Sequence, residues 1–156
     1  MVRSGVTRLT FAILLHVLCC GYAALRGGAP ERIVACSLLI AFAASIAIIK
    51  LVNPVGASPL MLLIDLTLLA CLYAVSVSSP RFWPIWATGL HILGAAAGLV
   101  RVVDPSMQIA GYQTMIRMPS YLILVTLTIG TVFHRLRLRR SGTDRSWRPS
   151  LRIRAR

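Results

Sequence analysis

Acidic residues are scarce in this sequence, which has 4 aspartates and glutamates against 17 basic residues. Lysine is scarcer still. Lys50 is the only lysine, and all the other basic residues counted in the 17 are arginines. With 57% hydrophobic residues and so few acids, the composition argues against an ordinary soluble domain of 156 residues. It predicts a protein that lives in a lipid bilayer.

Sequence motifs of catalysis and metal binding are also missing. The chain has no CxxC spacing, no GxSxG motif and no acidic residue close in sequence to a histidine. All the cysteines fall inside apolar segments, which predicts small buried hydrophobic side chains rather than disulfides or ligands: Cys19, Cys20, Cys36 and Cys71. We therefore expect neither an enzyme nor a metal site.

Long hydrophobic runs are what the sequence has in abundance. They predict an all-α integral membrane protein, a bundle of about five transmembrane helices formed by residues 1–134. The expected spans are residues 9–25, 33–52, 60–77, 82–102 and 116–133. The first run follows Arg3 and Arg8 and so also resembles a secretory signal, but we favour a span that is not cleaved.

The segments between these runs carry most of the polar residues. The glycines and the proline of residues 26–32 predict a turn whose charged side chains, Glu31 among them, stay in water. Residues 106–117 are more polar and predict a short interfacial helix, and His134 is expected to be solvated. Residues 135–156 have dense like charge and little to bury, which predicts a disordered tail.

Arginine is distributed very unevenly along the chain. Nine arginines fall within residues 135–156, so the positive-inside rule predicts a cytoplasmic C-terminus in a bacterial inner membrane. Residues near the membrane should contact anionic lipid headgroups: Arg135, Arg137, Arg139 and Arg140. The expected partners are the lipid bilayer and either another membrane protein or a second copy of the chain, and not nucleic acid.

The fourth span has one small and polar face. At helical spacing Ala87, Gly94 and Gly98 fall on one line with His91 and Arg101. Gly94 and Gly98 form a GxxxG motif, which lets membrane helices approach closely. The sequence therefore predicts that these three small residues pack against another helix.

Polar side chains within the spans offer three functional hypotheses. Asp65 is ionisable and lies inside the third span, where we expect it to pair with Arg101. This interpretation gives an accessory or interaction protein without enzymatic activity and without a cofactor. The alternatives are a small ion or metabolite carrier that uses Asp65 and His91, and a haem protein that uses His16 and His91 as axial ligands.

Three short strings carry a family resemblance: GGAPER after the first span, RFWPIWA at the start of the fourth, and RVVDP at its end. Together they resemble small polytopic inner-membrane proteins of alphaproteobacteria over roughly residues 25–135. The resemblance implies a location in the inner membrane and no particular activity.

Overall fold

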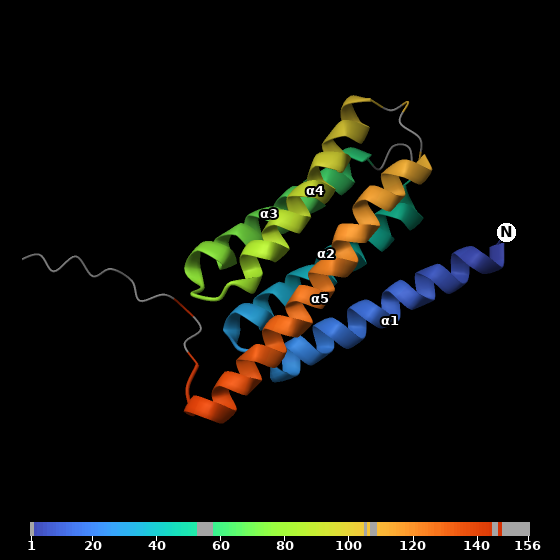
Figure 1. The fold of residues 1–156 in the computed structure, drawn as a ribbon. Coiled ribbons are helices and arrows are strands. Elements are labelled where there is room, and N and C mark those ends of the chain that lie inside the picture. The colour runs from blue at the N-terminus through green and yellow to red at the C-terminus, as the bar shows by residue number, and fades with distance from the viewer. Residues whose placement is uncertain (1, 53–57, 105, 107–108, 145–146, 148–156) are drawn as a thin grey trace, which may run out of the picture.

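The computed structural model describes residues 2–52, 58–104, 106, 109–144 and 147, and this part of the chain is helical without any strand (Figure 1). The helices are α1 (Val2–Arg26), α2 (Ala29–Leu51), α3 (Ser58–Ser78), α4 (Trp83–Val103) and α5 (Ile109–Ser141). The predicted all-α class is confirmed.

Each of these helices contains a stretch long and apolar enough to cross a membrane, so the chain is a multi-pass membrane protein. The stretches are Leu9–Arg26, Ala29–Leu51, Pro59–Ser78, Trp83–Val103 and Thr114–Ser141. Four of them agree with the predicted spans to within four residues at each end. The last is longer than expected and continues well beyond residue 133.

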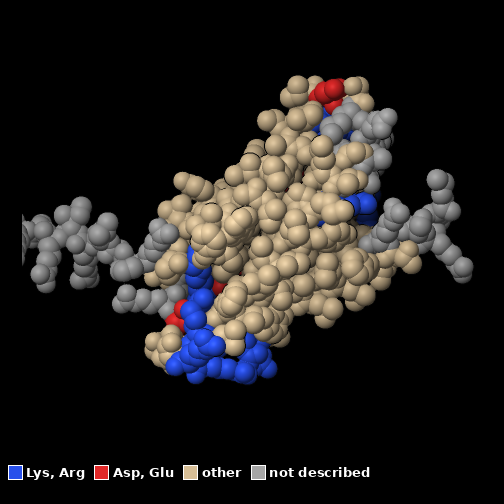
Figure 2. Space-filling model, in the orientation of Figure 1, with Lys and Arg blue, Asp and Glu red and all other residues tan. Residues whose placement is uncertain are grey.

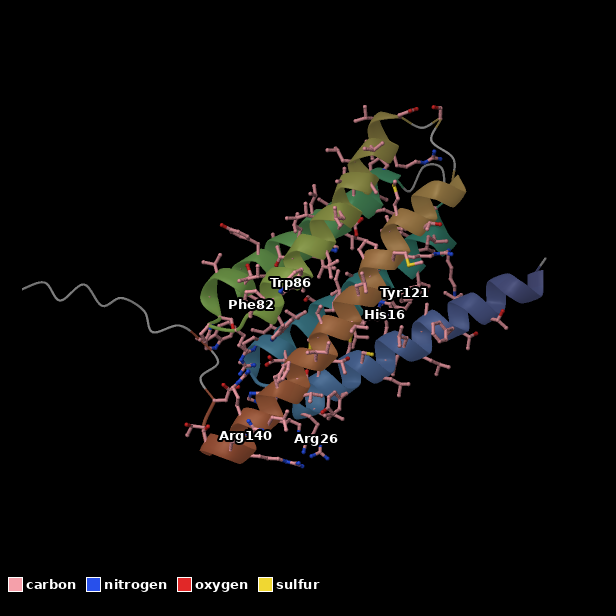
Figure 3. The ribbon with its side chains drawn as sticks, in the orientation of Figure 1. His16, Arg26, Phe82, Trp86, Tyr121 and Arg140 are labelled. Atoms are coloured by element: carbon pink, nitrogen blue, oxygen red, sulfur yellow. The ribbon has the colours of Figure 1, made fainter. Side chains whose placement is uncertain are left out.

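The helices form a closed ring in which each one packs on the next along the chain and α5 returns to α1. Because consecutive helices are antiparallel, the start of α1 and the end of α5 lie at opposite ends of the bundle (Figure 1). The end of α5 lies beside the α1–α2 and α3–α4 turns. We call this the arginine-rich end, since blue side chains gather there in Figure 2 and both Arg26 and Arg140 lie there in Figure 3.

The surface of the bundle suits a bilayer. Large apolar side chains are exposed on all the helices, with Leu18 68% and Leu93 62% exposed. In lipid these side chains need no further covering, and the helical backbone satisfies its own hydrogen bonds. The interior contains fully buried aliphatic side chains, among them Val34, Leu72, Ile123, Leu124 and Leu127.

The turn between α1 and α2 consists of Gly27 and Gly28 alone. A Cβ on Gly27 would lie 2.4 Å from the Ala23 carbonyl oxygen and 2.5 Å from Cβ of Glu31. Such distances exclude any side chain at this position. Helix α2 can therefore start directly after α1, with Glu31 folded back over the turn.

Helix α5 differs most from expectation. The predicted short interfacial helix over residues 106–117 is wrong, because α5 runs without a break from Ile109 to Ser141 and passes through Pro119. The Ser120 hydroxyl donates to the Ile116 carbonyl oxygen at 2.7 Å, beside the proline. Serine bonds of this kind help to accommodate proline in membrane helices.

The chain beyond the fifth span is also more ordered than expected. Residues 135–141 continue α5, so the predicted boundary at residue 134 is wrong for them. Gly142 ends the helix with φ of 70°, a left-handed conformation that glycine adopts without strain, and its N–H donates to the Leu138 carbonyl oxygen at 3.0 Å. Of the predicted disordered tail, residues 145–146 and 148–156 lie outside the described residues.

The predicted small face of α4 is buried, with Ala87, Gly94 and Gly98 all inside the bundle. The two glycines do not, however, allow a neighbouring helix backbone to approach closely. A Cβ on Gly94 would meet no atom within 4 Å, and one on Gly98 would make only ordinary contacts at 3.5 Å and beyond. All three residues are buried, but the GxxxG glycines leave room for a methyl group, so their packing role stays a prediction.

Gly130 on α5, unlike the glycines of the GxxxG motif, lies in close contact with a neighbouring helix. A Cβ at this position would lie 2.5 Å from the indole of Trp83 on α4. We expect Gly130→Ala to lower the free energy of unfolding by about 1 to 3 kcal/mol, because the indole has to move out of a packed site. The measurement is the melting temperature in mild detergent.

Gly94→Ala is the matched control, with the same change in a buried helical glycine. Since the added methyl group fits, it should be neutral or should stabilise the protein by up to about 1 kcal/mol through helix propensity. Equal losses in both variants would contradict the difference in packing.

Candidate functional site

A buried ion pair joins two helix starts at the arginine-rich end. Glu31, in the first turn of α2, is fully buried, and its carboxylate accepts from the guanidinium of Arg81, which precedes α4 and is 6% exposed. The same carboxylate accepts from the indole Nε1–H of Trp83 at 2.8 Å and from the N–H of Gly28 at 3.1 Å. The expectation that the charges of this turn stay in water is therefore wrong for Glu31.

A second acidic residue extends the pair into a cluster. Asp144, just beyond α5, accepts from Nη2 of Arg81 at 2.8 Å and from Nε of Arg137 at 3.1 Å. Nδ1 of His134 lies 2.5 Å from the Asp144 carboxylate and 3.0 Å from Nη2 of Arg81. His134 is 6% exposed, so the expectation that it is solvated is wrong. The ion cluster thus comprises Glu31, Arg81, His134, Arg137 and Asp144.

Small residues make room for this cluster. A Cβ on Gly28 would lie 2.9 Å from Nη2 of Arg81 and 3.1 Å from Cε1 of His134. Ser79 is fully buried, and its hydroxyl accepts from the N–H of Arg81 at 3.2 Å. Arg81 therefore connects three parts of the chain: the α1–α2 turn, the α3–α4 turn and the end of α5.

The charges of the cluster shift the titration of Asp144. Partial burial raises the pKa of this carboxyl, but the hydrogen bonds from His134 and Arg137 and the positive charges of Arg81 and Arg137 lower it more. The net result is a pKa below the usual value for aspartate, so Asp144 is ionised at neutral pH.

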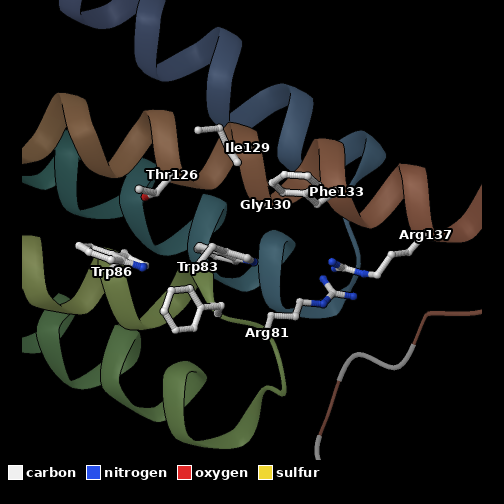
Figure 4. Close-up of a pocket in the computed structure, with 9 residues that line it drawn as sticks. Arg81, Trp83, Trp86, Thr126, Ile129, Gly130, Phe133 and Arg137 are labelled. Atoms are coloured by element: carbon white, nitrogen blue, oxygen red, sulfur yellow. The ribbon is translucent and has the colours of Figure 1, made fainter.

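A groove of about 290 Å³ opens beside the cluster, between the start of α4 and α5 (Figure 4). Arg81 and Arg137 line one end, and the remaining walls are apolar and aromatic apart from Thr126: Phe82, Trp83, Trp86, Thr126, Ile129, Gly130 and Phe133. Buried Nε of Arg81 has no hydrogen-bond partner among the described residues. The groove therefore has a cationic end and an apolar end.

The structure brings two of the predicted intramembrane candidates together. Nε2 of His91 on α4 lies 2.9 Å from the backbone carbonyl oxygen of Asp65 on α3, so the ring can donate to it. A carboxylate oxygen of Asp65 lies 3.6 Å from the Cβ position of Gly98. The expected pair of Asp65 with Arg101 is not among the ion pairs formed between described residues. Asp65 and His91 share one helix interface, but Arg101 does not join them in an ion pair.

The histidines of the haem hypothesis lie apart. His16 is on α1, where its ring stacks on Phe42 of α2 at 4.0 Å and Nδ1 lies 2.9 Å from the Ala12 carbonyl oxygen. His91 is on α4, which does not pack on α1. The arrangement gives the haem hypothesis no support, and haem stays an untested alternative.

The remaining candidates are the arginines of the last turns of α5 and the cysteines. Arg137, Arg139 and Arg140 are exposed and Arg135 is half-buried, at the end of the bundle where we expected headgroup contacts. All the cysteines are free. Cys20 is buried as predicted, whereas Cys36 is exposed on the apolar surface, which corrects the prediction for that residue.

Sequence reasoning missed the ion cluster, although two of the strings quoted above contain its centre. GGAPER includes Gly28 and Glu31, and RFWPIWA includes Arg81 and Trp83. The available signal is an acidic residue in a chain with 4 acids, three residues after a pair of glycines at which a side chain would collide with the cluster.

Comparison of the chain with models of protein families, with curated proteins and with solved structures found no match. The likeness to alphaproteobacterial inner-membrane proteins stays a prediction.

Proposed function

We propose that the protein is a non-enzymatic accessory protein of the bacterial inner membrane that engages its partner through the arginine-rich end, on the cytoplasmic side. The observation that carries this proposal is the ion cluster. Its acids are saturated by internal donors, so they hold helix ends together, while Arg139 and Arg140 beside the cluster remain exposed. A rigid, electropositive platform suits binding of an anionic surface better than chemistry.

The charge asymmetry supports the orientation. By number of basic residues the arginine-rich end is ahead, since it carries Arg26, Arg32, Arg81, Arg135, Arg137, Arg139 and Arg140. The opposite end carries Lys50, Arg101 and Arg117 together with Arg3 and Arg8 of α1. Under the positive-inside rule the more basic end stays in the cytoplasm.

Reporter fusions test this orientation. Fusions placed after Ser79 and after Ser141 should report a cytoplasmic location, and a fusion after Asp104 a periplasmic one, because the first two positions share the arginine-rich end. A periplasmic signal after Ser141 would place the platform on the wrong side of the membrane.

A matched pair of variants tests the accessory role. Arg139→Gln with Arg140→Gln removes two exposed charges from the arginine-rich end, and Lys50→Gln with Arg117→Gln removes two from the other end. A stoichiometric partner retained in mild detergent should be lost only from the first variant. Flux in proteoliposomes that disappears with Asp65→Asn would instead establish the carrier, and a haem absorption spectrum the redox alternative.

A further inference from the structure

We propose that the groove between α4 and α5 is a binding site for one anionic phospholipid, with the phosphate at Arg81 and Arg137 and an acyl chain along Trp86 and Ile129. This site goes beyond the accessory role and does not depend on which partner the arginine-rich end engages.

The groove has the polarity of a lipid in the adjoining leaflet. Its cationic end is formed by Arg81, which precedes α4, and by Arg137, near the end of α5. Its apolar end reaches Thr126, eleven residues earlier on α5, or about 16 Å along the helix at 1.5 Å per residue. A phospholipid in this leaflet has its phosphate at the same level as the arginines and its chains directed toward Thr126.

The cationic end is held in place before any ligand arrives. Glu31 and Asp144 fix the guanidinium of Arg81, whose side chain is only 3% exposed. Its Nε–H is an enclosed donor without a partner in the described part of the chain, so Arg81 contributes fixed positive charge to the groove wall. A phosphate is an anion suited to that charge.

The second guanidinium is available to the same anion. Arg137 bonds Asp144 through Nε and Nη2, but its side chain remains 45% exposed. Arginine presents several N–H donors in a planar fork, so it can hold Asp144 and still donate to a phosphate. Glu31 and Asp144 are the acidic groups that face these two arginines, and His134 is the remaining titratable neighbour.

The apolar walls fit an acyl chain. Trp83 packs against Gly130 and donates its indole N–H to Glu31, so its ring has no polar atom left to offer the groove. Phe82, Trp86, Ile129 and Phe133 are each roughly half exposed or more, facing outward where lipid is the surrounding medium. Figure 4 shows Trp83 between α4 and α5, Ile129 and Phe133 on α5, and the two arginines at one side.

The test measures lipid retention by native mass spectrometry, on the full chain purified in mild detergent. Phosphatidylglycerol and phosphatidylcholine of equal chain length are the probes. We expect one phosphatidylglycerol per chain, held at least about tenfold more tightly than phosphatidylcholine because the phosphate contacts are charge-assisted. Equal retention of the two lipids, or no retained lipid, would overturn the proposal.

Matched variants separate the groove from general attraction to a basic surface. Arg137→Gln should weaken phosphatidylglycerol binding about tenfold, whereas Arg139→Gln, exposed but outside the groove, should change it less than about twofold. Ile129→Ala should likewise weaken binding, and Leu122→Ala, an equally exposed aliphatic residue of α5, should not. Equal effects within either pair would mean a loose lipid shell and would contradict a site.

Inorganic phosphate separates the lipid from its headgroup. At the same concentration it should not displace phosphatidylglycerol, because it makes no contact with the apolar wall. Displacement by phosphate alone would show an anion site without a lipid chain and would overturn the proposal as stated.

Discussion

Arg81→Gln should lower the free energy of unfolding by about 3 to 5 kcal/mol, the cost of leaving a buried charge without its partner. Glu31 would keep only the Trp83 indole and the Gly28 N–H as donors to a fully buried carboxylate. The expected result is a large fall in melting temperature in detergent.

The Glu31→Gln variant should also be strongly destabilised, because Arg81 would keep Asp144 but lose its deepest partner. Combining the two changes removes both charges of the buried pair, so neither is left buried without its partner. The double variant should therefore recover much of the loss. Additive losses in this double-mutant cycle would mean that the two side chains do not interact.

Arg137→Gln is the control for the same cluster. Arg137 pairs with Asp144 at a side-chain exposure of 45%, and exposed ion pairs contribute about 0 to 1 kcal/mol. Its melting temperature should stay near that of the original protein. A loss as large as that of Arg81→Gln would show that burial is not what makes the Arg81 contacts strong.

Much of the fold could be predicted because membrane helices leave a local signal. An apolar run of about 20 residues is visible in the sequence whatever it packs against, so four predicted spans are nearly correct. The fifth predicted span ends too early, at residue 133, because Arg135 and Arg137 are typical of the start of a solvated tail. In the structure Asp144 folds back onto Arg137 and His134, which stabilises the last turns of α5.

The ion cluster could not be predicted in the same way, because its contacts are not local. Arg81 lies 50 residues from Glu31 and 53 from His134 in the sequence. Charged residues at span ends are usually solvated, so the sequence predicts Glu31 in water. Only the arrangement of the helices around the ring brings the two turns and the end of α5 together.

The interface of Asp65 and His91 shows an intermediate case. The antiparallel packing of α3 on α4 follows from a short connection, and it correctly brings Asp65 to the small face of α4. The partner of the carboxylate depends on side-chain direction, which spacing along a helix does not specify. Asp65 therefore lies beside Gly98 and not in an ion pair with Arg101.

Asp144→Asn should destabilise the protein at neutral pH by about 1 to 3 kcal/mol, the usual range for hydrogen bonds to charged groups. Asp144 is the acceptor that fastens the chain beyond Gly142 to Arg81, His134 and Arg137. An amide keeps one oxygen as acceptor but turns a nitrogen donor toward these donors. Cleavage by trypsin after Arg139 and Arg140 should accelerate as the end of α5 loosens.

Asp104→Asn is the control with the same chemical change. Asp104 is exposed at the opposite end of the bundle, and its carboxylate accepts from the backbone N–H and the hydroxyl of Ser106, two residues further along the chain. Its loss should leave both the melting temperature and the tryptic cleavage of α5 unaltered. Equal sensitivity of the two variants would rule out a specific role for Asp144.

The difference in stability between the original protein and Asp144→Asn should depend on pH, because the pKa of Asp144 is lowered. A carboxyl group whose pKa is lower in the folded than in the unfolded protein stabilises the fold above the unfolded value, about 3.9 for aspartate. That stabilisation is lost as the pH falls through the folded pKa, because the protonated acid no longer attracts Arg81 and Arg137. The stability gap between the original protein and Asp144→Asn should therefore close as the pH falls below about 4. Subtracting the two melting curves cancels the titration of groups that do not contact Asp144, so a gap that persists unchanged through this acid range would contradict an ionised, paired Asp144.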